Sequence, residues 1–257
     1  MEPENQRKFK LRKVSTALLM AAGMGTRIRP LSQHTPKPLI PVKGTPIIET
    51  IIQSIINAGI NNIIITIGYK KEMYQYLRDK YGDVIKFVEN IEYMSKNTIS
   101  SFYAAMELLR NKNCIICESD LYISDSTIIK GEMDKSRYFL RNVPPQNYEW
   151  GFELDNDIVK KVVRPDPEVF LDHHMYGIAY WMKEDLELLI NATKKAYQVQ
   201  GHEDMAYDEI GNGIFDKINM GIIRINSGQL DEVDCINDLI KLDPSYNTYL
   251  NNNQSER

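Results

Sequence analysis

The chain has 257 residues, with 31 Lys and Arg against 35 Asp and Glu, which gives a formal net charge of −4 at pH 7. This length suits one large α/β domain with a substantial core, and the slightly acidic balance argues against a general nucleic-acid-binding role. No window of about 18 uninterrupted apolar residues predicts a membrane span. No long apolar stretch follows the basic start of the chain, so we expect no signal peptide and a cytoplasmic location.

Strands and helices alternate through the first half of the sequence. Residues 1–13 are a basic tail that we expect to be disordered, and one domain is expected over 14–246. Strands are predicted over 15–21, 63–68, 84–88 and 114–117, and helices over 47–58, 70–81 and 99–110. Short buried strands separated by helices predict a parallel sheet covered on both faces. In such sheets, ligands bind at the carboxyl ends of the strands.

The second half changes in character. Strands, partly antiparallel, are predicted over 136–141, 150–154, 158–163, 176–182 and 221–225, and helices over 183–199, 207–217 and 235–241. We expect this half to form a lid over the first. The polar segment 247–257 is predicted to be a disordered tail.

The loop after the first strand carries most of the functional information. It contains Gly23 and Gly25, followed by Arg27 and Arg29. Because glycine has no Cβ, the backbone N–H groups of such a loop can approach phosphate oxygens, and an arginine fork suits a phosphate. Lys37 lies between two prolines and is expected in an extended segment. Taken alone, the two glycines are equally consistent with a simple connecting turn.

The longer motif is more specific. Ala-Ala-Gly-x-Gly-Thr-Arg-x-x-Pro-Leu-Ser, followed by Thr-Pro-Lys-Pro-Leu, resembles the signature of nucleotidyltransferases that activate sugar 1-phosphates and phosphocholine. The segments Asn90 to Tyr103, Glu118-Ser-Asp120, Glu149-Trp150 and Glu232-Val-Asp234 extend the similarity to bacterial choline-phosphate cytidylyltransferases. This resemblance covers about residues 14–242. It implies a Rossmann-like mixed α/β sheet covered by helices on both faces (the nucleotidyltransferase fold), a partly antiparallel acceptor-binding lid, and Mg²⁺ as cofactor. The family has Asp where this chain has Glu118, and residues 164–176 have no clear counterpart.

The chemistry can be argued from charge. A phosphate acceptor is mostly a dianion at pH 7, so it needs no general base to attack the α-phosphorus of a nucleoside triphosphate. Positioning and charge neutralisation therefore carry the catalysis. Arg27 and the loop amides of residues 22–26 suit the β- and γ-phosphates, and Lys37 suits the α-phosphate and the acceptor phosphate. Asp120 and Asp234 are the predicted Mg²⁺ ligands.

The predicted site residues can be collected by role. The catalytic candidates are Lys37 and Arg27, and the nucleotide-binding candidates in the loop are Ala22, Gly23, Met24, Gly25 and Thr26. The resemblance adds Asn97 and Ser101 near the base and ribose, and Trp150, Tyr207 and Asp208 for the acceptor. Aromatic faces and a carboxylate are what a quaternary ammonium requires.

Several of these residues have a purely structural alternative. Asp120 can be a turn carboxylate, Asp234 can cap the helix near 235, and Asn97 or Thr98 can cap the helix after it. Arg29 can hold the loop against a carboxylate, and Trp150 can be buried on a strand.

The cysteines and histidines predict no metal site. Cys114 and Cys117 are expected to be core thiols on opposite faces of a strand, and the three cysteines of the chain fit a reducing compartment. The histidines at 173, 174 and 202 are expected on the surface or in loops.

The expected reaction is transfer of CMP from CTP to phosphocholine, which gives CDP-choline and pyrophosphate. The alternatives are an aminoethyl acceptor (2-aminoethylphosphonate or phosphoethanolamine), a sugar 1-phosphate, or a catalytically silent nucleotide-binding subunit. A silent relative is expected to lose one of four residues that this chain retains, namely Arg27, Lys37, Asp120 and Asp234. The sequence does not determine the oligomeric state.

Overall fold

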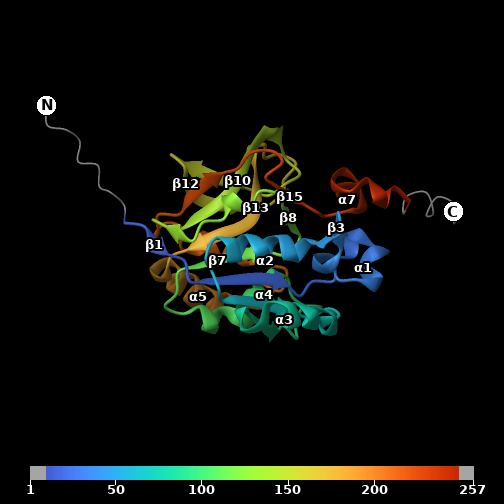
Figure 1. Cartoon of the computed structure of the whole chain (residues 1–257). Helices are drawn as coiled ribbons and strands as arrows, with labels where there is room; N and C mark the ends of the chain where they lie inside the picture. The colour runs from blue at the N-terminus through green and yellow to red at the C-terminus, as the bar shows by residue number, and fades with distance from the viewer. Residues whose placement is uncertain (1–9, 249–257) are drawn as a thin grey trace, which may run out of the picture.

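The computed structural model describes residues 10–248, and a seven-stranded mixed sheet forms its centre (Figure 1). The strand order is β14-β10-β13-β7-β2-β5-β6. The strands are β2 (Thr16–Ala21), β5 (Ile63–Ile67), β6 (Ile85–Glu89), β7 (Cys114–Glu118), β10 (Arg137–Gln146), β13 (Leu171–Trp181) and β14 (Gly221–Arg224). The four strands from the first half are parallel, and β13 runs antiparallel to both of its neighbours, β7 and β10. The predicted mixed α/β sheet is confirmed.

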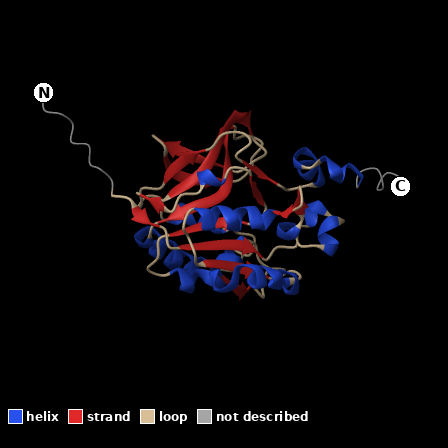
Figure 2. Cartoon of the chain, viewed as in Figure 1, coloured by secondary structure: helices blue, strands red, loops and turns tan. Residues whose placement is uncertain are grey.

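Helices cover both faces of this sheet, as Figure 2 shows. They are α1 (Leu31–His34), α2 (Ile47–Asn57), α3 (Gln75–Tyr81), α4 (Thr98–Ala105), α5 (Lys183–Ala196), α6 (Tyr207–Ile210) and α7 (Ile236–Leu242). Side chains alternate between the two faces of a strand. Leu19 of β2 therefore packs in the same core as α2, whereas Leu18 packs in the core that contains α4 and α5. Cys117 and Cys114 divide between the same two cores, which confirms that both are core thiols.

Within residues 10–248, four short two-stranded ladders complete the architecture. They are β1 (Arg12–Lys13) with β9 (Glu132–Met133), β3 (Pro41–Val42) with β4 (Thr45–Pro46), β8 (Leu121–Ile123) with β15 (Leu230–Glu232), and β11 (Gly151–Asp155) with β12 (Ile158–Val163). The β11–β12 hairpin turns at Asn156 and Asp157, both of which have positive φ. Asn and Asp adopt this left-handed conformation more readily than most residues.

The structure differs from the sequence predictions at both ends of the predicted domain. Arg12 and Lys13, assigned to the tail, form β1, and Arg12 pairs with Glu184 at 2.7 Å. Asn247, assigned to the other tail, is helical and bonds to the carbonyl of Pro244. Residues 1–9 and 249–257 of the predicted tails lie outside the described residues.

The second half also differs in detail. β13 begins at Leu171 rather than 176, so the histidines at 173 and 174 lie on a strand of the main sheet. Three strands of the predicted lid thus extend the central sheet, and the β11–β12 hairpin forms a separate ladder. α6 ends at Ile210 instead of continuing to 217, because Gly211 and Gly213, which are poor helix formers, make a 3₁₀ turn there.

Candidate active site

A cavity of about 530 Å³ lies at the carboxyl ends of β2 and β7. Its walls come from both halves of the chain: the glycine loop, the start of α4, the β7–β8 turn, the segments just before and just after the β11–β12 hairpin, and the end of β15. Of the predicted site residues, those that line it are Ala22, Gly23, Gly25, Thr26, Arg27, Lys37, Asn97, Ser101, Asp120, Trp150, Asp208 and Asp234. Met24 and Tyr207 are not among its lining residues.

Glycine suits positions 23 and 25 of the loop for two different structural reasons. Gly25 has a φ of +58°, and a Cβ built there would lie 2.8 Å from the Cβ of Lys37. A side chain at 25 would therefore strain the backbone and displace Lys37. A Cβ at Gly23 would meet no atom within 4 Å, and this glycine is exposed toward the cavity. Gly23 leaves the loop backbone uncovered, as a phosphate-binding loop requires.

Lys37 is the central cation of the site. Its Nζ donates to Asp120 Oδ2 at 2.9 Å and to Asp234 Oδ1 at 2.8 Å, and 9% of its side chain is exposed. Burial alone would lower the pKa of Lys37, but the charges of Asp120 and Asp234 outweigh it and raise the pKa above its usual value. The ammonium is therefore permanently charged. Arg27, with 70% of its side chain exposed, donates to the same Asp234 oxygen at 2.7 Å.

The predicted extended backbone at Lys37 is wrong. The residue opens a 3₁₀ turn, Lys37–Leu39, in which the N–H of Ile40 donates to the carbonyl of Lys37. The extended conformation occurs one residue earlier, at Pro36, with a ψ of 138°. The preference of a residue before proline for an extended backbone is a local tendency. Here the 3₁₀ turn overrides it and places the ammonium between two carboxylates from distant elements.

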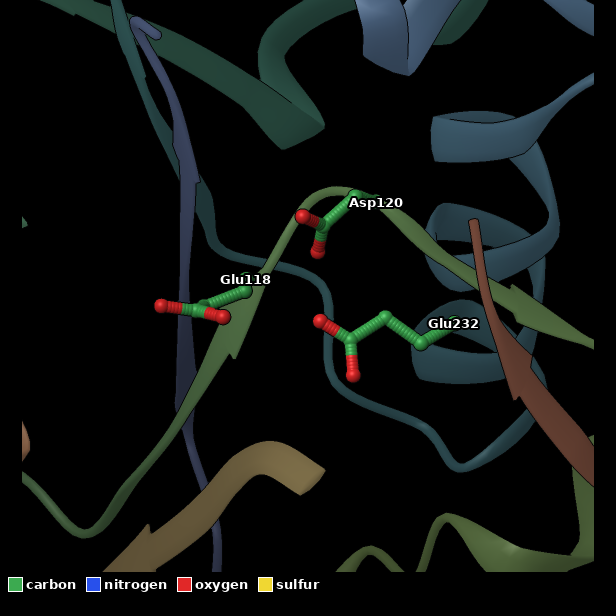
Figure 3. Close-up of side chains that lie close together, drawn as sticks. All are labelled: Glu118, Asp120 and Glu232. Carbon is green, nitrogen blue, oxygen red and sulfur yellow. The ribbon is translucent and has the colours of Figure 1, made fainter. Parts of the chain in front are cut away.

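Three carboxylates that line the cavity lie close together, as Figure 3 shows. Glu118 ends β7, Asp120 follows it, and Glu232 ends β15, and one oxygen of each lies within 4.8 Å of the others. Burial raises the pKa of Glu118 well above its ordinary value, and the charges of Asp120, Asp208 and Glu232 add to the effect. Burial likewise raises the pKa of Glu232 to about 7. The neighbouring carboxylates therefore oppose one another's ionisation, and a bound cation would relieve this opposition.

This cluster fits a divalent cation such as Mg²⁺. Its ligands are hard carboxylate oxygens, which Mg²⁺ prefers. Asp120 Oδ1 is buried and has no hydrogen-bond partner within residues 10–248, so it is free to coordinate. Of the two predicted ligands, Asp120 belongs to this cluster and Asp234 does not. Asp234 Oδ1 instead accepts from both Lys37 and Arg27. A magnesium ion bound there would neutralise charge on the triphosphate and on the leaving pyrophosphate.

The sequence reasoning missed Glu232 and gave Glu118 only as a departure from the family pattern. A usable signal existed for Glu232, because it precedes Asp234 by two residues and alternate residues of a strand share a face. The glycine at 177 on β13 also has a role, since a Cβ there would lie 2.6 Å from the Cγ of Glu118. Glycine at 177 makes room for the longer carboxylate.

The histidine expectation is wrong for two of the three residues. His173 is buried on β13, where its Nε2 accepts from the N–H of Phe152 at 3.0 Å. His174 lines the cavity and places its Nε2 3.4 Å from Glu232 Oε2. Their side chains point to opposite faces of β13. His173 packs near Phe152 with ring centroids 6.1 Å apart, and His174 stacks on Tyr176 with ring centroids 4.6 Å apart.

Two structural alternatives can now be decided. Asn97 caps α4, and its Oδ1 accepts from the N–H of Thr98 at 2.7 Å, although it also lines the cavity. Asp234 is not the cap of α7, because the carboxylate of Asp238 accepts from the N–H groups at the start of that helix. The side chain of Asp234 is thus available to the cations of the site.

The predicted acceptor residues are only partly brought together. Tyr207 is fully buried and packs against Phe102 with ring centroids 5.7 Å apart, so it belongs to the core. Trp150 lines the cavity, but the guanidinium of Arg164 lies 5.4 Å from its ring centroid. Asp208 lines the cavity and is 2% exposed. Burial raises the pKa of Asp208 to about 7, although the hydroxyls of Tyr138 and Tyr207 lower it.

Comparison with known proteins identifies the family. Residues 16–136 match the family model described as Nucleotidyl transferase. A 2-aminoethylphosphonate cytidylyltransferase from Lancefieldella rimae is 38% identical over 232 residues, which is 90% of this chain and 93% of the relative. The chain belongs to the nucleotidyltransferase family. This nucleotidyltransferase is therefore an enzyme that transfers a nucleotidyl group.

Two further comparisons confirm the resemblance seen in the sequence. A choline-phosphate cytidylyltransferase from Streptococcus pneumoniae is 28% identical to this nucleotidyltransferase over 88% of the chain and 96% of the relative. The solved structure of CTP:phosphocholine cytidylyltransferase from the same species superposes with a TM-score of 0.81, covering 90% of this chain and 99% of that one. Within residues 10–248, the nucleotidyltransferase has no helix long and apolar enough to cross a membrane.

Proposed function

We propose that this nucleotidyltransferase transfers CMP from CTP to 2-aminoethylphosphonate and releases pyrophosphate. A phosphonate oxygen would attack the α-phosphorus of CTP, an O–P bond would form, and the bond to the β-phosphate would break. CTP is favoured as the donor because both the Lancefieldella and the Streptococcus relatives are cytidylyltransferases. In this proposal Lys37 and Arg27 stabilise charge on the phosphates, and Asp120 with its acidic neighbours holds the magnesium ion.

The acceptor assignment is carried by the chemistry of the predicted acceptor positions. A quaternary ammonium has no N–H group and is recognised by aromatic faces. Here Tyr207 is buried in the core, and Arg164 already lies over the ring of Trp150. A primary ammonium has three donors and needs directed acceptors. Asp208 offers one, because its buried carboxylate lines the cavity.

Phosphocholine is the second candidate. It is favoured by the 28% identical Streptococcus relative and by three aromatic residues that line the cavity, Tyr93, Tyr148 and Trp150. Phosphocholine is the acceptor expected from the sequence alone. The order is reversed here, because the acceptor aromatics on which that choice depended are only partly in the cavity.

A pyrophosphate-release screen would test the proposal. Four nucleoside triphosphates would be paired with 2-aminoethylphosphonate, phosphoethanolamine, phosphocholine and several sugar 1-phosphates, and kcat/KM compared. Methylating the ammonium leaves a buried carboxylate oxygen unpaired, which costs about 1–3 kcal/mol. We therefore expect kcat/KM for 2-aminoethylphosphonate to exceed that for phosphocholine by about tenfold or more.

A variant pair would link this preference to the structure. Asp208→Asn should lower kcat/KM for 2-aminoethylphosphonate by about tenfold or more, because one hydrogen bond to a charged group is worth about 1.5–3 kcal/mol. The control Asp216→Asn changes an exposed carboxylate that does not line the cavity and should leave both acceptors unchanged. A higher kcat/KM for phosphocholine in the wild-type protein would overturn the acceptor assignment. If none of the tested acceptors is turned over, the alternative of a catalytically silent subunit is favoured.

A further inference from the structure

We propose that Arg164 is a positioning residue that couples the nucleotide side of the cavity to the acceptor side. The inference goes beyond the proposed function and holds for whichever acceptor the nucleotidyltransferase uses. It takes from the proposed function only that Asn97 lies on the nucleotide side and that Trp150 and Asp208 lie on the acceptor side. Arg164 follows β12 and is not itself among the residues that line the cavity.

The guanidinium of Arg164 is held by three groups of one short segment, residues 204–209. Its Nη1 donates to Asp204 Oδ2 at 3.0 Å, and its Nη2 donates to the backbone carbonyl of Asp204 at 2.8 Å. Its Nε and Nη2 also form a two-pronged ion pair with Glu209, with both distances 2.6 Å. A planar fork with several donors can make these contacts at once, whereas an ammonium cannot.

One carbonyl oxygen joins this arrangement to the nucleotide side. The backbone oxygen of Asp204, which accepts from Arg164, also accepts from Asn97 Nδ2 at 3.2 Å. The N–H of Asn97 donates to the carbonyl of Glu203 at 2.7 Å, and the hydroxyl of Thr98 accepts from the N–H of Tyr207 at 3.1 Å. Hydrogen bonds therefore tie the start of α4 to the segment before α6.

The same arginine reaches the acceptor side by two routes. Its guanidinium lies 5.4 Å from the ring centroid of Trp150, within the range of a cation–π contact. Glu209, its ion-pair partner, also accepts from the N–H of Ala206 at 2.8 Å and so caps α6, the helix that carries Asp208 into the cavity. A shift of Asn97 on nucleotide binding would thus be transmitted through the Asp204 carbonyl and Arg164 to both Trp150 and Asp208.

Initial rates measured over a matrix of nucleotide and acceptor concentrations would test the coupling. In the wild-type protein, the KM for the acceptor should fall by about fivefold or more between low and saturating CTP, the size of a typical coupling between two sites. In Arg164→Ala this dependence should disappear, while kcat with both substrates saturating changes by less than about threefold. Arg164→Lys should not restore it, because lysine lacks the fork.

The chain offers a matched control. Arg224 makes a two-pronged pair with Asp157, with both distances 2.8 Å, and its side chain is 44% exposed compared with 45% for Arg164. Neither Arg224 nor Asp157 lines the cavity, so Arg224→Ala should keep the coupling. An acceptor KM in the wild-type protein that does not depend on CTP would overturn the proposal. So would coupling retained in Arg164→Ala or Arg164→Lys, or equal loss in Arg224→Ala.

A binding measurement separates this proposal from the proposed function and needs no turnover. CTP alone should change the tryptophan fluorescence of the wild-type protein. Trp150, which lines the cavity, should produce this change, because Trp181 is fully buried in the core. The change should be lost in Arg164→Ala and kept in Arg224→Ala. If no acceptor is turned over but this pattern is observed, the proposed function fails and the coupling stands. A CTP-induced change that persists in Arg164→Ala would overturn the coupling.

Discussion

Replacing Lys37 by methionine tests the central electrostatic feature of the site. Methionine keeps an unbranched apolar stem next to Gly25, but it leaves Asp120 and Asp234 without the ammonium that each contacts at under 3 Å. Removing one partner of a fully buried ion pair costs about 3–5 kcal/mol. Because these carboxylates are 20% and 22% exposed, water screens part of the charge, and we expect a loss of about 2 kcal/mol in the free energy of unfolding.

This loss has two measurable consequences. In metal-free buffer, the unfolding temperature should fall by about 4–8 °C, since about 1 kcal/mol corresponds to 2–4 °C in a chain of this size. Magnesium should restore part of the stability, because Asp120, one of these two carboxylates, is a proposed ligand of the ion. The value of kcat in a pyrophosphate-release assay should fall by about 10²–10³, the effect of losing one preorganised donor to the transition state.

The control is Lys71→Met, which removes an exposed pair with Glu89 and should cost less than about 1 kcal/mol without affecting kcat. A Lys37→Met protein that keeps more than about a tenth of the wild-type kcat would remove Lys37 from the mechanism. If its unfolding temperature equalled that of the wild type in metal-free buffer, the ion pairs with Asp120 and Asp234 would carry no stability.

Three further predictions concern the metal, the buried acid and the loop. EDTA should abolish activity, and Mg²⁺ should restore it. Asp120→Asn should raise the Mg²⁺ concentration that gives the half-maximal rate by about tenfold or more, because a hard anionic ligand is lost. An unchanged Mg²⁺ titration in this variant would mean that the ion is held elsewhere. The pKa of Asp208 rises from 3.8 to about 7 on folding, so folding favours its protonated form, and metal-free stability should fall as the pH rises from about 4 to 7. Asp208→Asn should flatten that slope in thermal unfolding scans, and an unaltered slope would contradict the assignment. Gly25→Ala should lower both the unfolding temperature and the activity, because φ at residue 25 is positive and Lys37 lies too close for a Cβ. Gly23→Ala should instead raise the KM for CTP and leave the stability unchanged. Equal unfolding temperatures for the two variants would refute this reasoning.

The sequence predicted those parts of the fold that depend on local pattern. The alternation of apolar strands and amphipathic helices in the first half indicated a parallel sheet, and the structure confirms it. The predicted start of β13 lies too late in the chain, because His173 and His174 interrupt the apolar pattern of the strand. The burial of these histidines depends on neighbouring strands that no local pattern reveals. The order of the strands, with β13 between β7 and β10, likewise depends on long-range pairing.

In the candidate site, too, the sequence predicted what depends on a local motif and missed what depends on distant residues. The glycine loop and Lys37 were recognised from a continuous motif, and most of the predicted residues do line one cavity. The partners of Lys37 lie 83 and 197 residues away in sequence, so its ion pairs could not be derived from the motif. Tyr207 and Trp150 were assigned by resemblance alone, and their surroundings differ from what an aromatic cage requires.

The position of β13 has a consequence for the synthesis of the protein. β7 is fully apolar on both faces from Cys114 to Cys117, and one of its edges pairs with β13, whose residues follow it by more than fifty positions. Until the ribosome has made residue 181, that edge lacks its native partner, and an unpaired apolar edge is a template for association between chains. A shortened protein that ends at residue 136, where the match to the family model ends, would contain the glycine loop and Asp120 but leave this edge open. We therefore expect it to aggregate, because the catalytic half can complete its sheet only with a strand that arrives late from the other half.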